Sequence, residues 1–201
     1  MLLAPPLCWG CRAPAARTEP LCPGCRRRLR LAGPAPEPVS GLKVGAALVY
    51  EGPARDLVRA LKFRGAVGLA DAMAALMIAA APPGLLSGAL VPVPLHPLRR
   101  RARGFNQAER LTRALGRRTG LPVADCLVRP GVGRRQVGRG RGDRLAGPRG
   151  AIKAGGRVPA RAVLVDDVVT TGATLSACAA ALRAAGATDV EAFAFARTPA
   201  R

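Results

Sequence analysis

Short apolar runs alternate with longer alanine- and leucine-rich stretches along the chain. The runs at 44–50, 89–93 and 161–165 predict strands, and the last is β-branched and apolar enough for a buried parallel strand. Composition and period predict helices at 53–63, 69–80, 104–118 and 174–185. This order predicts an α/β domain, in which strands alternate with helices.

Two adjacent carboxylates and a small, hydroxyl-rich turn follow the strand at 161–165. The turn leads into a predicted helix, so its backbone N–H groups and hydroxyls lie at a helix N-terminus, which favours a phosphate. The carboxylates can accept hydrogen bonds from a ribose diol, directly or beside a hydrated Mg²⁺. The segment therefore predicts a sugar-phosphate site made of Asp166, Asp167, Thr170, Thr171, Gly172, Ala173 and Thr174.

The alternative for the same segment is a simple helix cap, since Asp and Thr are good N-cap residues. Capping accounts for one hydroxyl and gives no reason for two carboxylates at the end of an apolar strand, where α/β proteins bind ligands. A nucleotide-binding P-loop is excluded because the chain contains no Gly-Lys-Ser/Thr run.

Four cysteines form two Cys-x-x-Cys knuckles separated by ten residues: Cys8, Cys11, Cys22 and Cys25. This spacing predicts a structural zinc ion held by four thiolates, and a reducing cytosol disfavours the alternative of disulfides. The segment between the knuckles has few apolar residues, so we expect it to need the metal to fold. We expect Trp9 to pack against the metal site, and Cys126 and Cys178 to be buried as small apolar residues.

Prolines at 34, 36 and 38 stiffen a segment that marks a domain boundary. We expect a four-cysteine zinc-binding module at 1–31, a Pro-rich linker at 32–43 and the main domain at 44–201. The 201 residues are 49% apolar, which is enough for a core. No apolar run has transmembrane length, and the first seven residues lack the basic start of a signal peptide, so a cytoplasmic protein is expected.

The acidic pair with its Thr-Gly loop resembles the signature of the type I phosphoribosyltransferases. The motifs Leu-Val-Pro-Val-Pro-Leu at 90–95 and Arg-Gly-Phe-Asn-Gln at 103–107, together with the cysteine cluster, narrow the resemblance to the ComF family, over about residues 8–197. The resemblance implies the type I phosphoribosyltransferase fold, a central, mostly parallel sheet flanked by helices, with a small N-terminal zinc ribbon. It also implies binding of 5-phosphoribosyl-1-pyrophosphate with Mg²⁺.

The same resemblance places the pyrophosphate at the loop that follows the strand 89–93, beside Leu95, His96 and the arginines at 99–103. Asn106 and Gln107 suit either helix caps or substrate contacts, and the resemblance favours a site role. Lys62 matches a lysine of ComF-like proteins, and its alternative is a solvated cation at a helix end.

The segment 129–150 is dense in glycine and arginine and is expected to be mobile when no substrate is bound. It suits a basic arm for nucleic acid or a lid over a polyanionic substrate. The resemblance makes this segment a catalytic loop that carries Arg129, Gln136 and Arg144. Together with Arg103, which lies earlier in the chain, these are the catalytic residues that the resemblance implies. The chain departs from the family at Gly147, where asparagine is usual. Thr170 stands where purine-salvage relatives have a carboxylate, so the resemblance favours an amine acceptor.

A net charge of +20, from 32 basic and 12 acidic residues, supports a second hypothesis. Arginine clusters can follow a nucleic-acid backbone, although few aromatic residues are present to stack on bases. ComF-like proteins are associated with DNA uptake in natural transformation. The alternative to a phosphoribosyltransferase is therefore a non-catalytic module of that machinery, with single-stranded DNA or a competence helicase as its partner.

Overall fold

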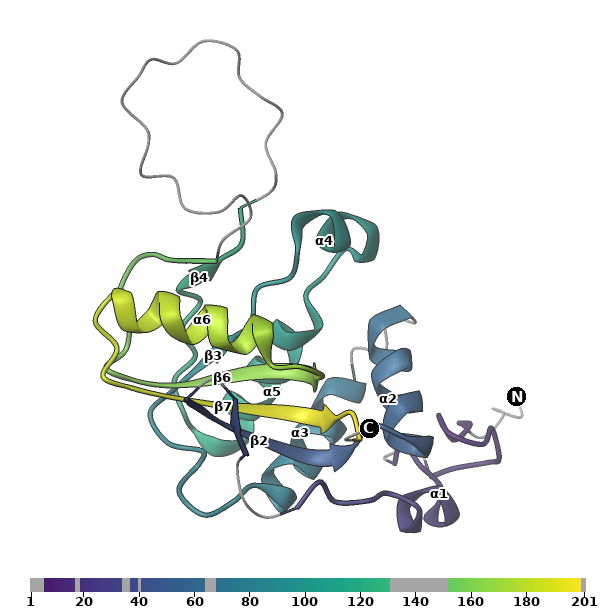
Figure 1. Ribbon diagram of the computed structural model, residues 1–201. Coiled ribbons are helices and arrows are strands. Elements are labelled where there is room, and N and C mark those ends of the chain that lie inside the picture. The colour runs from purple at the N-terminus through teal and green to yellow at the C-terminus, as the bar shows by residue number, and fades with distance from the viewer. Residues whose placement is uncertain are drawn as a thin grey trace.

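The central feature of the molecule is a five-stranded sheet with the order β1-β2-β7-β6-β3 (Figure 1). The computed structural model describes residues 6–16, 19–33, 37–39, 41–63, 68–130 and 152–199. The strands are β1 (Glu37–Val39), β2 (Leu42–Val49), β3 (Ala89–Pro92), β6 (Arg161–Val169) and β7 (Asp189–Arg197). All neighbours are parallel except β1, which is antiparallel to β2. The predicted α/β fold with a mostly parallel sheet is confirmed.

Helices cover both faces of the sheet, as Figure 1 shows. They are α2 (Gly52–Phe63), α3 (Leu69–Ala80) and α5 (Gln107–Thr119) on one face, and α6 (Ala173–Ala184) on the other. Successive side chains of a strand point to opposite faces. In β7, Phe193 and Phe195 therefore join the core under the first three helices, while Ala192 and Ala194 face α6. The two phenylalanines thus pack on the face of the sheet that three helices cover.

Three elements in this part of the chain differ from the sequence-based expectation. A short helix, α4 (Pro97–Arg103), occupies the region expected to be a loop, and α5 begins only at Gln107. His96 caps α4, since its Nδ1 accepts from the backbone N–H of Leu98 at 3.3 Å, and Gly104 ends α4 in the left-handed conformation with φ 77°. The strand β6 continues through the acidic pair to Val169, four residues beyond its predicted end, because it pairs with β7 over this length.

The N-terminal segment packs onto the sheet domain. Its helix α1 (Pro23–Arg27) contributes Cys25, which is buried with Leu21 in the core under α2 and α3. Residues 30–32 run beside β2, where the N–H of Val49 donates to the carbonyl of Arg30 at 2.8 Å. Residues 37–39, expected in the linker, form the edge strand β1.

The opposite edge of the sheet, at β3, is also occupied. The N–H of Leu90 donates to the carbonyl of Pro122 at 2.8 Å, and the carbonyl of Leu90 accepts from Ala124 at 2.9 Å. Beyond this contact, β4 (Leu127–Val128) and β5 (Lys153–Ala154) form a small antiparallel pair next to α6. The segment that follows α5 is thereby fixed along the edge of β3.

Candidate functional site

A pocket of about 730 Å³ opens where the parallel strands β3 and β6 end. Because neighbouring parallel strands end at the same edge, the loops that follow them meet there, which is where open α/β sheets bind ligands. The pocket brings together the predicted site residues Leu95, His96, Asn106, Gln107, Arg129, Asp166, Asp167, Thr170 and Thr174.

The acidic pair lies near the end of β6 and lines this pocket. Asp167 is 4% exposed, and its Oδ2 lies 2.8 Å from the Nζ of Lys62, at the end of α2. Asp166 accepts the backbone N–H of Asp167 on its Oδ1 at 2.8 Å. Burial raises the pKa of Asp166 well above its ordinary value, and the nearby charge of Asp167 raises that pKa further. The site therefore holds one firmly paired carboxylate and one that retains its proton more readily.

The loop after β6 forms a small hollow of about 40 Å³ at the N-terminus of α6. Gly172, with φ 73°, is the N-cap residue of α6 and has no side chain to occupy the helix end. Thr171 accepts the backbone N–H of Ala173 on its Oγ1 at 3.4 Å. Asp166 borders both this hollow and the larger pocket. The predicted loop residues 170–174 thus surround the end of a helix dipole, which favours an anion.

On the β3 side, Asn106 and Gln107 use their amides to hold the structure together. Asn106 caps α5, since its Oδ1 accepts from the N–H of Ala108 at 3.1 Å, and its Nδ2 donates to the carbonyl of Val93 at 2.9 Å. Gln107 is 5% exposed and accepts from Arg103 at 3.1 Å on its Oε1. Both amides border the pocket, but Asn106 also fixes the end of β3 against α5.

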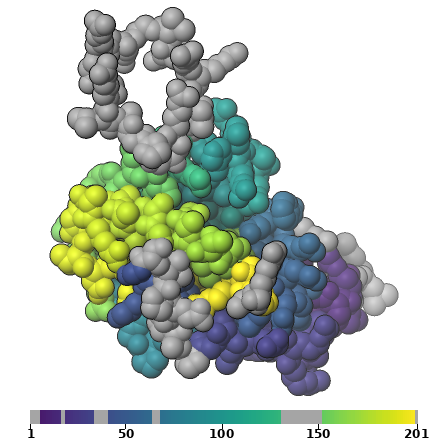
Figure 2. Space-filling view, viewed as in Figure 1, coloured from purple at the N-terminus to yellow at the C-terminus, as the bar shows by residue number. Residues whose placement is uncertain are grey.

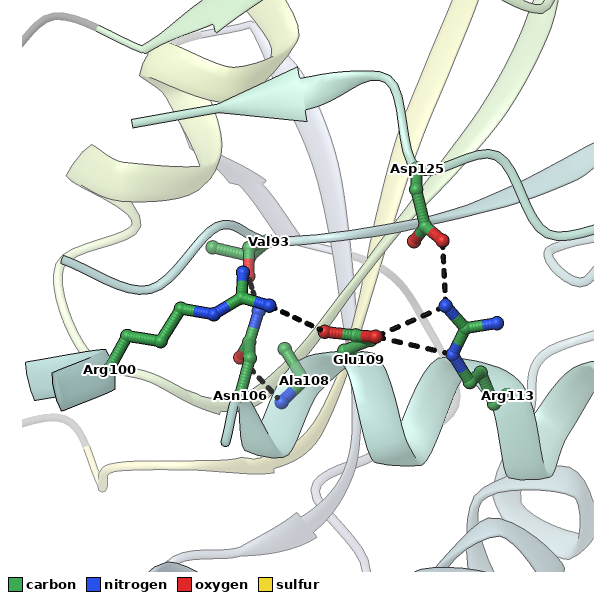
Figure 3. A network of polar contacts seen from close by, with 7 residues as sticks. All are labelled: Val93, Arg100, Asn106, Ala108, Glu109, Arg113 and Asp125. Atoms are coloured by element: carbon green, nitrogen blue, oxygen red, sulfur yellow. Dashed lines mark hydrogen bonds and ion pairs between the residues drawn. The ribbon is translucent and has the colours of Figure 1, made fainter. Parts of the chain in front are cut away.

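A chain of ion pairs holds α4 beside α5, as shown in Figure 3. Glu109 lies between Arg100, at 3.8 Å, and Arg113, at 3.1 Å, and Arg113 also reaches Asp125 at 2.8 Å. Half or more of each arginine side chain is exposed, so each pair contributes little stability alone. The Arg100–Glu109 pair is the member of this chain that joins α4 to α5, and no residue of α4 is buried.

The arginines predicted to surround an anion are divided between several surfaces. Arg99 and Arg129 line the pocket, whereas Arg100 and Arg101 line a neighbouring depression. Arg103 lies over the ring of Phe63, with its Cζ 5.2 Å from the ring centre, in addition to its bond to Gln107. The predicted catalytic residues Gln136 and Arg144, and Gly147, lie outside the described residues.

Two site residues were not among those that the acidic motif and the loops predicted. Lys62 and Tyr50 both line the pocket. Of the two alternatives for Lys62, the structure places it in the site, with its side chain 20% exposed and its ammonium group paired to Asp167. Its sequence signals were its place at the end of a helix and its match to a lysine of ComF-like proteins. Neither predicts the contact with Asp167, because that contact joins parts of the chain that are far apart.

The four N-terminal cysteines lie together, with all four Sγ atoms within 4.8 Å of one another. Cys8 and Cys25 are buried, and Cys11 and Cys22 approach to 3.6 Å between sulfurs. Burial opposes ionisation of Cys8, but backbone N–H groups, that of Cys22 foremost, outweigh it and lower its pKa to about 6. Four thiols this close together can hold a metal ion such as zinc, which binds four cysteine sulfurs in structural sites.

The absence of a side chain at Gly10 leaves room for the Sγ of Cys25. A Cβ atom at position 10 would lie 2.9 Å from the Sγ of Cys25, closer than side chains approach. The other two cysteines behave as the sequence predicted: Cys126 and Cys178 are 5% and 0% exposed, and burial raises the pKa of Cys178 to about 12. Trp9 packs partly buried against the core beside the cluster.

No helix among the described residues is both long enough and apolar enough to cross a bilayer. No protein-family model matches the chain. Among curated proteins, it is 37% identical over 108 residues to competence protein ComFC of Streptococcus pneumoniae, covering 53% of this chain and 47% of that protein. It is 35% identical over 117 residues to competence protein F of Haemophilus influenzae, covering 56% and 51%.

These two alignments span about half the length of each competence protein. A third relative aligns over its whole length. The DNA utilization protein YhgH of Escherichia coli is 30% identical over 237 aligned positions, which cover 98% of this chain and 100% of that protein. With the α/β fold and the N-terminal four-cysteine cluster, this full-length match establishes that the chain belongs to the ComF family.

Proposed function

We propose that the pocket at the ends of β3 and β6 binds 5-phosphoribosyl-1-pyrophosphate. In this arrangement the 5′-phosphate lies at the N-terminus of α6 against residues 170–174, and the ribose diol binds Asp166 and Asp167. The pyrophosphate lies beside Arg99 and the loop after β3. The observation that carries the proposal is that the acidic pair, the Thr-rich loop and the loop after β3 open into one pocket.

The acidic pair also suits a magnesium ion, because carboxylate oxygens are ligands that Mg²⁺ prefers. Bound together with the pyrophosphate, Mg²⁺ supplies positive charge that offsets the charge of the leaving group. Lys62 neutralises part of the negative charge of the pair from the side of α2. These features support binding of a polyanionic sugar next to two carboxylates.

The reaction that we propose is transfer of the phosphoribosyl group to an amine. The bond between C1 of the ribose and the pyrophosphate oxygen breaks, and its electron pair leaves with the pyrophosphate. The nitrogen forms the new bond to C1 and loses a proton to solvent. Arg99 and Arg129 line the pocket and stabilise the growing negative charge of the pyrophosphate. Thr170 supports an amine over a purine, since it offers no carboxylate.

We infer that this activity serves the handling of DNA that has been taken up. The inference rests on the names of the relatives, two competence proteins and a DNA utilization protein. We also propose that the protein acts in the cytoplasm, a reducing compartment in which the four clustered cysteines stay available to bind a metal ion.

Calorimetric titration with 5-phosphoribosyl-1-pyrophosphate and Mg²⁺ tests the site. We expect saturable binding by the wild-type protein and none by the double variant Asp166→Asn with Asp167→Asn. The matched control is Asp189→Asn with Glu191→Gln, which removes the same charge from β7, and we expect it to bind normally. Unchanged affinity in the first double variant would refute the assigned site.

The second candidate is a single-stranded DNA-binding module without turnover, and the net charge of +20 favours it. Release of pyrophosphate distinguishes the two functions. Transfer to an amine releases pyrophosphate in step with loss of the sugar substrate, whereas a binding module releases none with any amine while it still retains DNA.

A further inference from the structure

The helix α2 connects the four-cysteine cluster with the sugar-phosphate pocket. The N-terminal segment and α2 pack side by side, as Figure 2 shows. The buried residues Leu57 and Leu61 of α2 belong to the same core as Cys8 and Cys25, two of the four clustered cysteines. At the other end of the connection, Lys62 of α2 lines the pocket. A single helix therefore contacts both sites.

The first cysteine knuckle lies against one side of α2. Trp9, which belongs to this knuckle, is partly buried and packs against the core that contains Leu57 and Leu61. Trp9 and Gly10 also line a depression together with residues 56, 59, 60 and 63 of α2. The N-terminal segment thus contacts α2 along much of its length.

The last two residues of α2 reach two different walls of the pocket. The Nζ of Lys62 lies 2.8 Å from the Oδ2 of Asp167, on β6. The ring of Phe63 lies under the guanidinium group of Arg103, whose Cζ is 5.2 Å from the ring centre and which donates to Gln107. Asp167 and Gln107 both line the pocket. Because a helix moves as a rigid element, a displacement of its side at the cysteine cluster also moves its end at the pocket.

We propose that metal binding at the cysteine cluster controls the sugar-phosphate pocket by positioning Lys62. Without a metal ion the four thiols are not held together, so Cys25 and Trp9 no longer support α2. Lys62 then leaves Asp167, and the uncompensated carboxylate repels a polyanionic ligand. Cys11 is exposed, which leaves the cluster open to metal exchange. The effect on affinity rests on the proposed function, whereas the position of Lys62 can be measured without a substrate.

The acetylation rate of Lys62 measures its pairing directly. The chain contains three lysines, Lys43, Lys62 and Lys153, so mass spectrometry can follow each of them separately. In the zinc-loaded protein we expect the Lys62 side chain, which is 20% exposed, to react more slowly than that of Lys43, which is 70% exposed. After zinc is removed with a chelator, Lys62 should react severalfold faster and Lys43 as before. An unchanged rate for Lys62 would overturn the proposal.

Cys178 shows whether the sheet domain stays folded when the metal is removed. It is 0% exposed and belongs to the core under α6, on the face of the sheet opposite to α2. We therefore expect iodoacetamide to leave Cys178 unmodified in the metal-free protein. Modification of Cys178 together with faster acetylation of Lys62 would also overturn the proposal, since the metal would then stabilise the whole fold and not α2 in particular.

Calorimetry with 5-phosphoribosyl-1-pyrophosphate and Mg²⁺ measures the effect on the pocket. We expect removal of zinc to raise the Kd of the wild-type protein about tenfold, a usual size for coupling between two sites. Lys62→Gln should bind more weakly than the wild-type protein, with the same Kd whether zinc is present or not. A Kd that rises equally in both proteins would contradict a route through Lys62.

The two measurements separate this inference from the proposed function. A wild-type protein that binds no 5-phosphoribosyl-1-pyrophosphate, with or without zinc, would refute the proposed function. The acetylation rates of Lys62 would still support or overturn the control of its position by the metal.

Discussion

At the scale of single residues, two lysine–carboxylate pairs differ in how far water reaches them. The Nζ of Lys62 lies 2.8 Å from Asp167, and these side chains are 20% and 5% exposed. The Nζ of Lys43 lies 3.5 Å from Glu191, and Lys43 is 70% exposed. Loss of a partner costs most where the remaining charge has no water to solvate it.

We therefore expect Lys62→Met to lower the free energy of unfolding by about 3 kcal/mol, because it leaves the buried carboxylate of Asp167 without a cation. Lys43→Met should change it by less than about 1 kcal/mol. Urea unfolding monitored by circular dichroism measures both.

The double variant Lys62→Met with Asp167→Asn separates the lost charge from lost packing. Since it removes both charges, it should recover most of the stability that Lys62→Met loses. Similar losses in the Lys62→Met and Lys43→Met variants would show that burial of the pair has no energetic effect.

Some residues of the candidate site could be predicted from the sequence and others could not. The acidic pair, the Thr-rich loop and the cysteine knuckles were predicted because each is a local pattern with its own chemistry. The partner of Asp167 was not assigned, since Lys62 meets it only after α2 folds against β6. The positions of Lys62 and Asp167 in the sequence do not indicate that the two side chains meet.

At the scale of elements, β7 and α4 were not predicted because each lacks the sequence pattern that identifies a strand or a helix. In β7, four alanine and phenylalanine residues alternate at 192–195, and alanine is a weak strand former. Its middle place in the sheet comes from pairing with β2 and β6. The helix α4 buries no residue, so it has no apolar period, and its signals were the Pro97 start and the Gly104 end.

The two cysteine knuckles allow a prediction at this scale, because their glycines differ in surroundings. A Cβ at Gly10 would press against the Sγ of Cys25 at 2.9 Å, whereas one at Gly24 would lie 3.9 Å from the nearest atom, the Sγ of Cys22. Gly10→Ala should therefore displace a metal ligand and weaken zinc retention about tenfold or more. Zinc content after dialysis against a graded chelator series measures this.

Gly24→Ala is the matched control. Gly24 lies in α1, where alanine is favoured over glycine by about 0.5–1 kcal/mol, so this variant should keep its zinc and unfold at the same or a higher temperature. Equal zinc loss in both variants would mean that crowding at Cys25 is not what Gly10 relieves.

At the scale of the whole molecule, the excess of 32 basic over 12 acidic residues governs encounters with nucleic acid. Each phosphate contact on a single strand adds about −0.7 to the slope of log affinity against log salt. We expect oligo(dT) affinity to fall with a slope of about −2 or steeper, which corresponds to about three phosphate contacts. Anisotropy titrations from 50 to 200 mM KCl, a range chosen to span roughly physiological salt, measure the slope. A flat response of the affinity to salt would contradict electrostatic binding of the strand.

The covered edges of the sheet have a consequence for how copies of this protein meet. On one side β2 is bordered by β1 and residues 30–32, and on the other β3 is bordered by residues 122–124. The outermost strand, β1, is three residues long and contains Pro38, which cannot donate a ladder hydrogen bond. The folded chain thus offers a poor template for strand addition, and amyloid-like growth from this sheet would first require one of its borders to detach.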